Sequence, residues 1–149
     1  MITIRLTNSE VMQGAHVGML RQVENMQKQR KARYGAGHAN DWQLNIEGAL
    51  AEMALAKYLN CYWAKGTVGE KDVGGVQVRS SPRANARLIL HPDDSDDDVF
   101  YQVTGVNGVY DVHGWILGCN GKREEFWCDP TGNNRYAYFV PYEALTLLS

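Results

Sequence analysis

The sequence predicts a single α+β domain over residues 1–149, with two N-terminal helices flanking a mixed, largely antiparallel sheet. Apolar residues recur at three- and four-residue steps up to about Leu59, and at every second residue from about Val76 onward. A chain of 149 residues suits one hydrophobic core. Hydrophobic residues make up 44% of the chain and charged residues 21%, which is typical of a globular protein and argues against disorder.

The first elements are a short strand and a helix. Apolar and polar residues alternate over 2–6, and Thr7, Asn8 and Ser9 then offer side chains that cap a helix. The helix is expected to run to about Arg33, because Gly35 and Gly37 follow and end it. The apolar residues of this helix recur at helical spacing, and they are Met12, Ala15, Met19, Val23 and Met26.

A second helix is predicted from roughly Trp42 to Leu59, with Asp41 as its cap. At about 100° per residue its apolar residues form two sectors, and Glu52 falls between them. This carboxylate therefore points into the protein. A buried carboxylate is costly unless it meets an arginine, a set of N–H groups or a metal ion.

The rest of the chain is predicted to form strands. Residues 76–81, 87–91, 98–105 and 109–118 alternate polar and apolar side chains, and Asn107-Gly108 indicates a type I′ hairpin turn. We interpret these segments as a run of antiparallel strands. Residues 136–140 predict another strand, and Pro141 fits the first turn of a short closing helix over 141–148.

Four polar residues suggest a metal site. Mg²⁺ prefers oxygen ligands and uses few protein oxygens, which Glu52, Asp72 and the amide of Gln77 could supply. Gln77 and Arg79 are two residues apart and therefore share one face of their strand, whereas Val76 and Val78 face the core.

These segments resemble the PD-(D/E)XK nuclease superfamily, which is restriction-endonuclease-like. The segment NIEGALAEMALAKYLN (45–60) is similar to the family's first helix with its glutamate, and DVGGVQVR (72–79) to its Asp…(Glu/Asp)-x-Lys element. The segments LILHPDDSDDDVFYQVTG, GWILG and YFVP look like a group of small, uncharacterised phage-associated proteins with this core. The resemblance implies catalytic residues Glu52, Asp72, Gln77 and Arg79, of which the first three would bind Mg²⁺ or Mn²⁺.

Two residues depart from the family pattern. Gln77 replaces a carboxylate and removes a negative charge, which weakens the binding of a divalent cation. Arg79 replaces lysine, and a guanidinium cannot shuttle a proton near neutral pH, although it can bind a phosphate. Reactivity would then depend on metal-activated water.

Structural alternatives stand beside this interpretation. Glu52 could pair with a buried arginine, and Asp72 could be a turn residue before Gly74-Gly75. Arg79, Arg83 and Arg87 could form a strip that contacts nucleic-acid phosphates, or they could pair with the acidic loop at Asp93–Asp98.

Other motifs are weaker. Counted from Asp94, the acidic loop lacks the glycine and glutamate of a calcium-binding loop, so we interpret it as solvated. His113, Cys119 and Cys128 do not have the spacing of zinc ligands. His38 is a loop histidine that could contact phosphate or act as a base.

The expected location is the cytoplasm of a bacterial host cell. Three cysteines without Cys-x-x-Cys spacing suit a reducing compartment, and neither a secretory signal nor a membrane span is apparent. The predicted partner is nucleic acid, DNA in the first place. A second copy of the chain or a host protein is an alternative, and no membrane partner is expected.

Two main hypotheses of function follow. The first is metal-dependent hydrolysis of phosphodiester bonds by a phage or bacterial nuclease, as endonuclease or exonuclease. The alternative is a catalytically inactive module of the same fold that binds DNA or a host protein, in an anti-defence or regulatory role. A third hypothesis is that the protein is a component of a virion or of its assembly.

Overall fold

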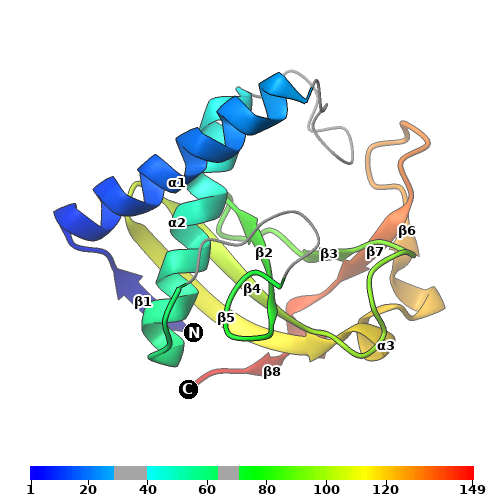
Figure 1. Ribbon diagram of the computed structural model, residues 1–149. Coiled ribbons are helices and arrows are strands. Elements are labelled where there is room, and N and C mark those ends of the chain that lie inside the picture. Colours follow the sequence, from blue (N-terminus) through cyan, green and yellow to red (C-terminus); the bar gives the residue numbers. More distant parts are fainter. Residues whose placement is uncertain (29–39, 64–70) are drawn as a thin grey trace.

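The structure is a computed structural model that describes residues 1–28, 40–63 and 71–149. Its main sheet separates two hydrophobic clusters. Helices α1 and α2 cover one face of this sheet, and a smaller sheet lies on the other side (Figure 1). The predicted α+β class, with a mixed and mostly antiparallel sheet, is confirmed.

Both predicted helices form. Helix α1 covers Asn8–Gln27, and the Thr7 side chain and Glu10 complete a capping box at its start. Helix α2 covers Asp41–Leu59, and its cap is Asn40 rather than Asp41. The predicted extension of the first helix to Arg33, its end at Gly35 and Gly37, and His38 all lie outside the described residues.

The main sheet has the strand order β1-β5-β4-β2, and β8 pairs with the far part of β5. Its bounds are β1 Ile2–Arg5, β2 Gln77–Ser81, β4 Val99–Val106, β5 Val109–Leu117 and β8 Thr146–Leu147. Asn107 and Gly108 both have positive φ, as the predicted type I′ hairpin between β4 and β5 requires. The amino group of Met1 donates to the carbonyl of Leu148, so the two ends of the chain meet.

A second sheet has the order β3-β7-β6, with β3 Leu88–Leu90, β6 Trp127–Cys128 and β7 Ala137–Val140. One cluster of buried residues joins α2 to the main sheet and includes Leu55, Val78 and Val103. The other joins the two sheets and includes Leu90 and Phe100. The two cores therefore form on opposite faces of the main sheet.

Two strand predictions and one helix prediction need correction. The predicted antiparallel run is wrong at β2, which pairs with β4 in parallel. Strand β3 pairs with β7 and belongs to the second sheet. The predicted closing helix is only a short 3₁₀ turn at Tyr142–Ala144, and β8 follows it because 146–147 pair with β5. A short helix, α3, spans Gly118–Gly121 after β5.

Helix α1 buries an unexpected side. Its buried residues are Gly14, Gly18 and Gln22, which lie against α2, whereas Met12, Met19 and Met26 are exposed. A Cβ atom at Gly18 would lie 2.4 Å from the Cα atom of Ile46. Small residues thus allow the two helices to approach closely, and the apolar face of the sequence pattern points outward.

Candidate functional site

Glu52 lies in the middle of α2, where every residue from Ala49 to Ala56 is buried. It is 8% exposed, as predicted. Arg21 of α1 donates from Nη1 and Nη2 to the two carboxylate oxygens of Glu52, both at 2.8 Å. The indole N–H of Trp63 donates to Oε2 at 3.2 Å. The structural alternative of a buried arginine partner is therefore confirmed.

Asp72 belongs to the same electrostatic group. Its negative charge helps raise the pKa of Glu52, although burial is the larger cause and Arg21 opposes both effects. Burial likewise raises the pKa of Asp72, against the hydrogen bond from Val78 and the positive charges of Arg79 and Arg21. The charge of Asp72 thus acts on Glu52, and Arg21 acts on both carboxyl groups.

Asp72 also has a structural task. Its Oδ2 atom accepts a hydrogen bond from the backbone N–H of Val78 at 2.7 Å. This bond spans a tight turn in which Val73 and Val76 pair and Gly74 and Gly75 have positive φ. The alternative of a turn residue is therefore also confirmed, and it leaves Oδ1 without a hydrogen bond among the described residues.

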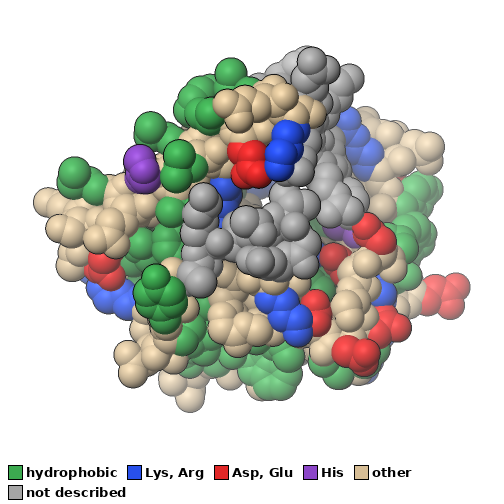
Figure 2. Space-filling view, viewed as in Figure 1, with side chains coloured by type: hydrophobic (Ala, Val, Ile, Leu, Met, Phe, Trp, Pro, Cys, Tyr) green, Lys and Arg blue, Asp and Glu red, His purple; other side chains and the backbone are tan. Residues whose placement is uncertain are grey.

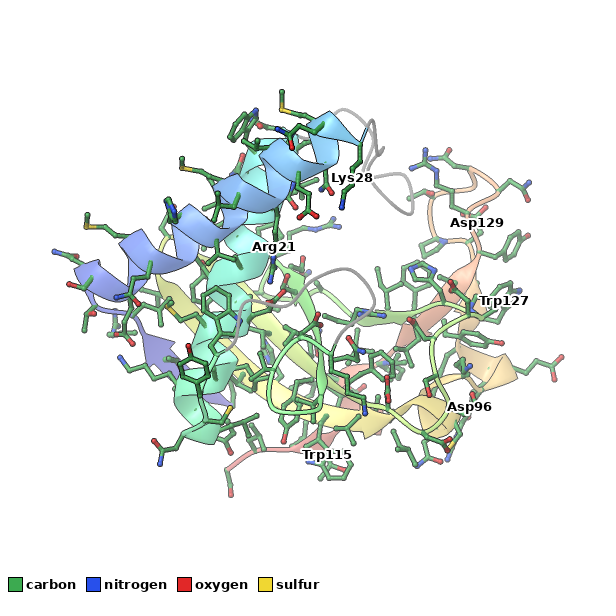
Figure 3. The ribbon with its side chains drawn as sticks, in the orientation of Figure 1. Arg21, Lys28, Asp96, Trp115, Trp127 and Asp129 are labelled. Atoms are coloured by element: carbon green, nitrogen blue, oxygen red, sulfur yellow. The ribbon has the colours of Figure 1, made fainter. Side chains whose placement is uncertain are left out.

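The sequence interpretation named Glu52 and missed Arg21. Figure 3 shows Arg21 extending from α1 toward the interior of the molecule. One signal for it was present, because a buried carboxylate needs a cation or N–H groups nearby. Arg21 lies three residues after Gly18 on α1. The sequence does not give the register between α1 and α2, and so does not show that Arg21 meets Glu52, 31 positions later in the chain.

Gln77 and Arg79 share one strand face as predicted, but that face is turned away from α2. Val78 between them packs with α2, so its neighbours point to the opposite side of β2. The guanidinium of Arg79 lies 4.9 Å from the ring centre of Phe100, which belongs to the other core. The prediction that Glu52, Asp72 and Gln77 meet in one pocket is therefore wrong for Gln77, which lies on the other side of β2 from Glu52.

Two carboxylates of the acidic loop at Asp93–Asp98 bind the side chains on this face of β2. Asp94 forms an ion pair with Arg79 at 2.6 Å and accepts the backbone N–H of His91. Asp98 accepts a hydrogen bond from the Gln77 amide and pairs with Lys71. The interpretation of a solvated loop is wrong for Asp94 and Asp98, because their carboxylates bind the side chains of Arg79 and Gln77 on β2.

The residues named as metal ligands do not fit a metal ion in this arrangement. Both oxygens of Glu52 bind Arg21, whose charge stands where a cation would be needed. The described part of the chain contains no group of three or more His, Cys, Asp or Glu side chains placed to hold a metal. His113, considered with the cysteines, is buried beside Thr104, with Nε2 2.6 Å from the hydroxyl oxygen.

A pocket of about 810 Å³ opens on the Arg79 side of the main sheet. It lies between β2, the segment that leads to β3, and the end of β6. All three residues of the predicted phosphate-binding strip, Arg79, Arg83 and Arg87, line it. Ile89 and Phe139, which are partners across the β3–β7 pair, add apolar surface.

The three arginines differ in their contacts. Arg79 is bound by Asp94 and by the carbonyl oxygen of Ile89. The side chains of Arg83 and Arg87 are exposed and make no ion pair or hydrogen bond within the described residues. The Asp94 carboxylate offsets the positive charge of Arg79. The net positive charge of the pocket therefore lies on the guanidinium groups of Arg83 and Arg87.

Comparison of the chain with protein-family models, curated proteins and solved structures found no match. The nuclease resemblance and its restriction-endonuclease-like core therefore stay predictions. None of the described helices has the length and apolar character needed to cross a membrane.

Proposed function

We propose that the chain binds nucleic acid through backbone phosphates at the Arg83–Arg87 pocket. The observation that carries this proposal is that Arg83 and Arg87, which make no ion pair or hydrogen bond among the described residues, line a pocket which also has an apolar wall. Guanidinium groups bind phosphate oxygens in a bidentate manner, and such contacts supply most sequence-independent affinity. The net charge of −2 for the whole chain means that the contact is local.

The shape and chemistry favour an unpaired strand over a rigid duplex. A pocket of about 810 Å³ is within the range that holds a nucleotide-sized ligand. Phe139 and Ile89 offer apolar surface to an unstacked base or sugar, while Arg83 and Arg87 face the phosphates. In a duplex the bases stay stacked and could not reach this wall.

The test is a binding measurement on a charge-reduced pocket. We expect wild type to bind a fluorescein-labelled 20-nucleotide single-stranded DNA more tightly than the matched duplex, measured by fluorescence anisotropy between 50 and 200 mM NaCl. The double variant Arg83→Gln/Arg87→Gln should bind at least about tenfold more weakly at 50 mM NaCl. Its slope of log affinity against log salt should be smaller by about 1.4, because two phosphate contacts are lost.

The matched control removes two positive charges elsewhere. Arg5→Gln/Arg123→Gln changes exposed residues that do not line the pocket, and its affinity should stay within about twofold of wild type. Equal losses in both double variants would show a general charge effect and would refute the pocket proposal. Absence of binding by wild type at 50 mM NaCl would refute it as well.

Hydrolysis of nucleic acid is the second candidate, and the observation behind it is that the negative charge of Asp72 helps raise the pKa of the buried Glu52. If the chain is a nuclease, wild type should cut plasmid and single-stranded DNA in the presence of Mg²⁺ or Mn²⁺ and Asp72→Asn should not, whereas the binding of both Glu52 oxygens by Arg21 argues for no cutting. The asparagine retains an acceptor for the Val78 N–H, so loss of cutting would not follow from loss of the turn. If wild type binds DNA and cuts no substrate with either metal, the binding module remains and the nuclease hypothesis is refuted.

A further inference from the structure

The outward face of α1 is apolar to an unusual degree. Met12, Met19 and Met26 are 73%, 44% and 57% exposed, and Leu20 and Val23 are about two-fifths exposed. Figure 2 shows hydrophobic side chains along α1 at the upper left of the molecule. A surface helix ordinarily turns its apolar residues inward and its charged residues outward, so this face has the character of a covered one.

The charges of α1 lie away from this face. Taking 100° per residue from Met19, the other two methionines lie within about 20° of it, whereas Glu10, Arg21 and Glu24 lie about 140° or more away. Glu10 pairs with Lys57 of α2, and Arg21 with Glu52. The remaining residues of the outward face are polar and include no Asp, Glu, Lys or Arg. They are Asn8, Ser9, Gln13, His16 and Gln27.

We propose that this face binds a second copy of the chain, as an antiparallel pair of α1 helices with a two-fold axis at Met19. Met12 and Met26 are each seven residues from Met19, which is close to two helical turns. Antiparallel pairing therefore places Met12 of one copy opposite Met26 of the other, and Ala15 opposite Val23. An isologous interface needs this kind of self-complementary pattern.

The absence of charged residues on the outward face of α1 favours a second copy of the chain as its partner. A face without Asp, Glu, Lys or Arg offers nothing to a polyanion or to a charged helix, but it meets its own copy without like-charge repulsion. Methionine side chains adapt their shape to one another, which favours pairing of two identical rows. No residue of α1 lines the pocket at Arg83 and Arg87, so pairing through α1 and DNA binding are measured separately.

The size of the face sets the expected affinity. A helix of 20 residues is about 30 Å long, and about half of its residues face outward. This is less than the 20 to 30 residues per partner of a standard interface, so the dimer should be reversible. We expect a dissociation constant on the order of 10 µM, which sedimentation velocity between about 1 and 200 µM would measure.

Met19→Glu is the decisive variant, because it places two carboxylates together at the two-fold axis. We expect at least a tenfold rise in the dissociation constant. Gln43→Glu is the matched control, since it adds the same charge at an exposed position of α2, outside the outward face of α1, and its constant should stay within about twofold of wild type. Circular dichroism would verify that both variants fold.

Crosslinking tests the geometry. In a Cys119→Ser background, which removes an exposed thiol, Met19→Cys should crosslink to itself with a short bismaleimide. Met12→Cys should not, because in the antiparallel pair its two copies are about 21 Å apart along the helix, but it should crosslink to Met26→Cys in a mixture. A monomer at 200 µM, a dimer that persists in Met19→Glu, or self-crosslinking of Met12→Cys would each overturn the proposal.

Discussion

Arg21 and Glu52 form the most consequential contact between single residues. The carboxylate is buried on α2, and the guanidinium from α1 satisfies both of its oxygens. Replacing a buried ion pair as a whole is often harmless, but removing one partner leaves an uncompensated charge. The contact therefore couples the position of α1 to the charge state of Glu52.

Removal of the guanidinium should be strongly destabilising. We expect Arg21→Met to lower the free energy of unfolding by about 3 kcal/mol at pH 7, measured by urea denaturation. Adding Glu52→Gln should recover most of this loss, because the amide carries no charge to bury. Lys28→Met is the control for an exposed ion pair with Glu24, and it should change the free energy of unfolding by less than about 1 kcal/mol.

The Arg21→Met deficit should depend on pH. Burial raises the pKa of Glu52, and loss of Arg21 removes the main opposing effect. A carboxyl group whose pKa is higher in the folded state binds more protons there, so its contribution to stability is present at low pH and is lost as pH rises through the folded pKa. The deficit should therefore be smaller at pH 4 than at pH 7, and an equal deficit at both would contradict this explanation.

At this scale the sequence predicted that Glu52 is buried, and it offered a turn role for Asp72 only as the alternative to a metal ligand. It could not identify Arg21 as the partner, because that requires the register between two helices. It also placed Gln77 and Arg79 correctly on one strand face. Which side of the sheet that face meets depends on where α2 packs, and no local pattern contains that information.

Helix α1 is the element whose packing differs most from its sequence pattern. Its apolar residues recur at helical spacing and predict a face toward the core. The observed contact with α2 uses Gly14 and Gly18 instead, because these positions allow the helices to come together most closely. Hydrophobic spacing alone does not show this, since glycine adds no apolar side chain to the count.

The close approach at Gly18 predicts a large difference between two similar substitutions. Gly18→Ala would place a Cβ atom 2.4 Å from the Ile46 backbone and should lower the free energy of unfolding by about 3 kcal/mol or more. Gly48→Ala, in α2, has open space around its new Cβ and should raise it by about 0.5 to 1 kcal/mol through helix propensity. Thermal denaturation of both variants is the measurement, and a stable Gly18→Ala would contradict the observed helix contact.

Element boundaries were better predicted than element partners. The period-two pattern located strands β2, β4 and β5, and Asn107-Gly108 located the hairpin between the last two. The parallel pairing of β2 with β4 needs a connection through β3, which leaves for the second sheet. Alternation along a strand gives its two faces but does not give its neighbours.

At the scale of the whole molecule, the acidic loop neutralises part of the positive charge of the arginine pocket. Asp94 neutralises Arg79 at the pocket wall, and Asp96 pairs with Lys122 outside it. The sequence showed the acidic and basic groups but left their pairing open, because the loop and the strand meet only in the folded chain. The balance of these charges sets how strongly the pocket attracts an anion.

Removal of the negative charge of Asp94 should strengthen DNA binding. Asp94→Asn frees the charge of Arg79, so single-stranded DNA should bind about threefold or more tightly at 50 mM NaCl, with a salt slope larger by about 0.7. Asp96→Asn changes the net charge equally, but Asp96 does not line the pocket, and it should have little effect. Anisotropy titrations compare the two, and equal gains would indicate a general charge effect instead.

The meeting of Met1 with Leu148 has a practical consequence. A linker of a few residues could join the two ends without crossing the protein, and the chain could be opened instead in the exposed loop between Asp129 and Arg135. Such a circular permutant would have the same neighbours in space but a different order of synthesis. Folding of such a permutant would show that the fold does not depend on the point at which synthesis of the chain begins.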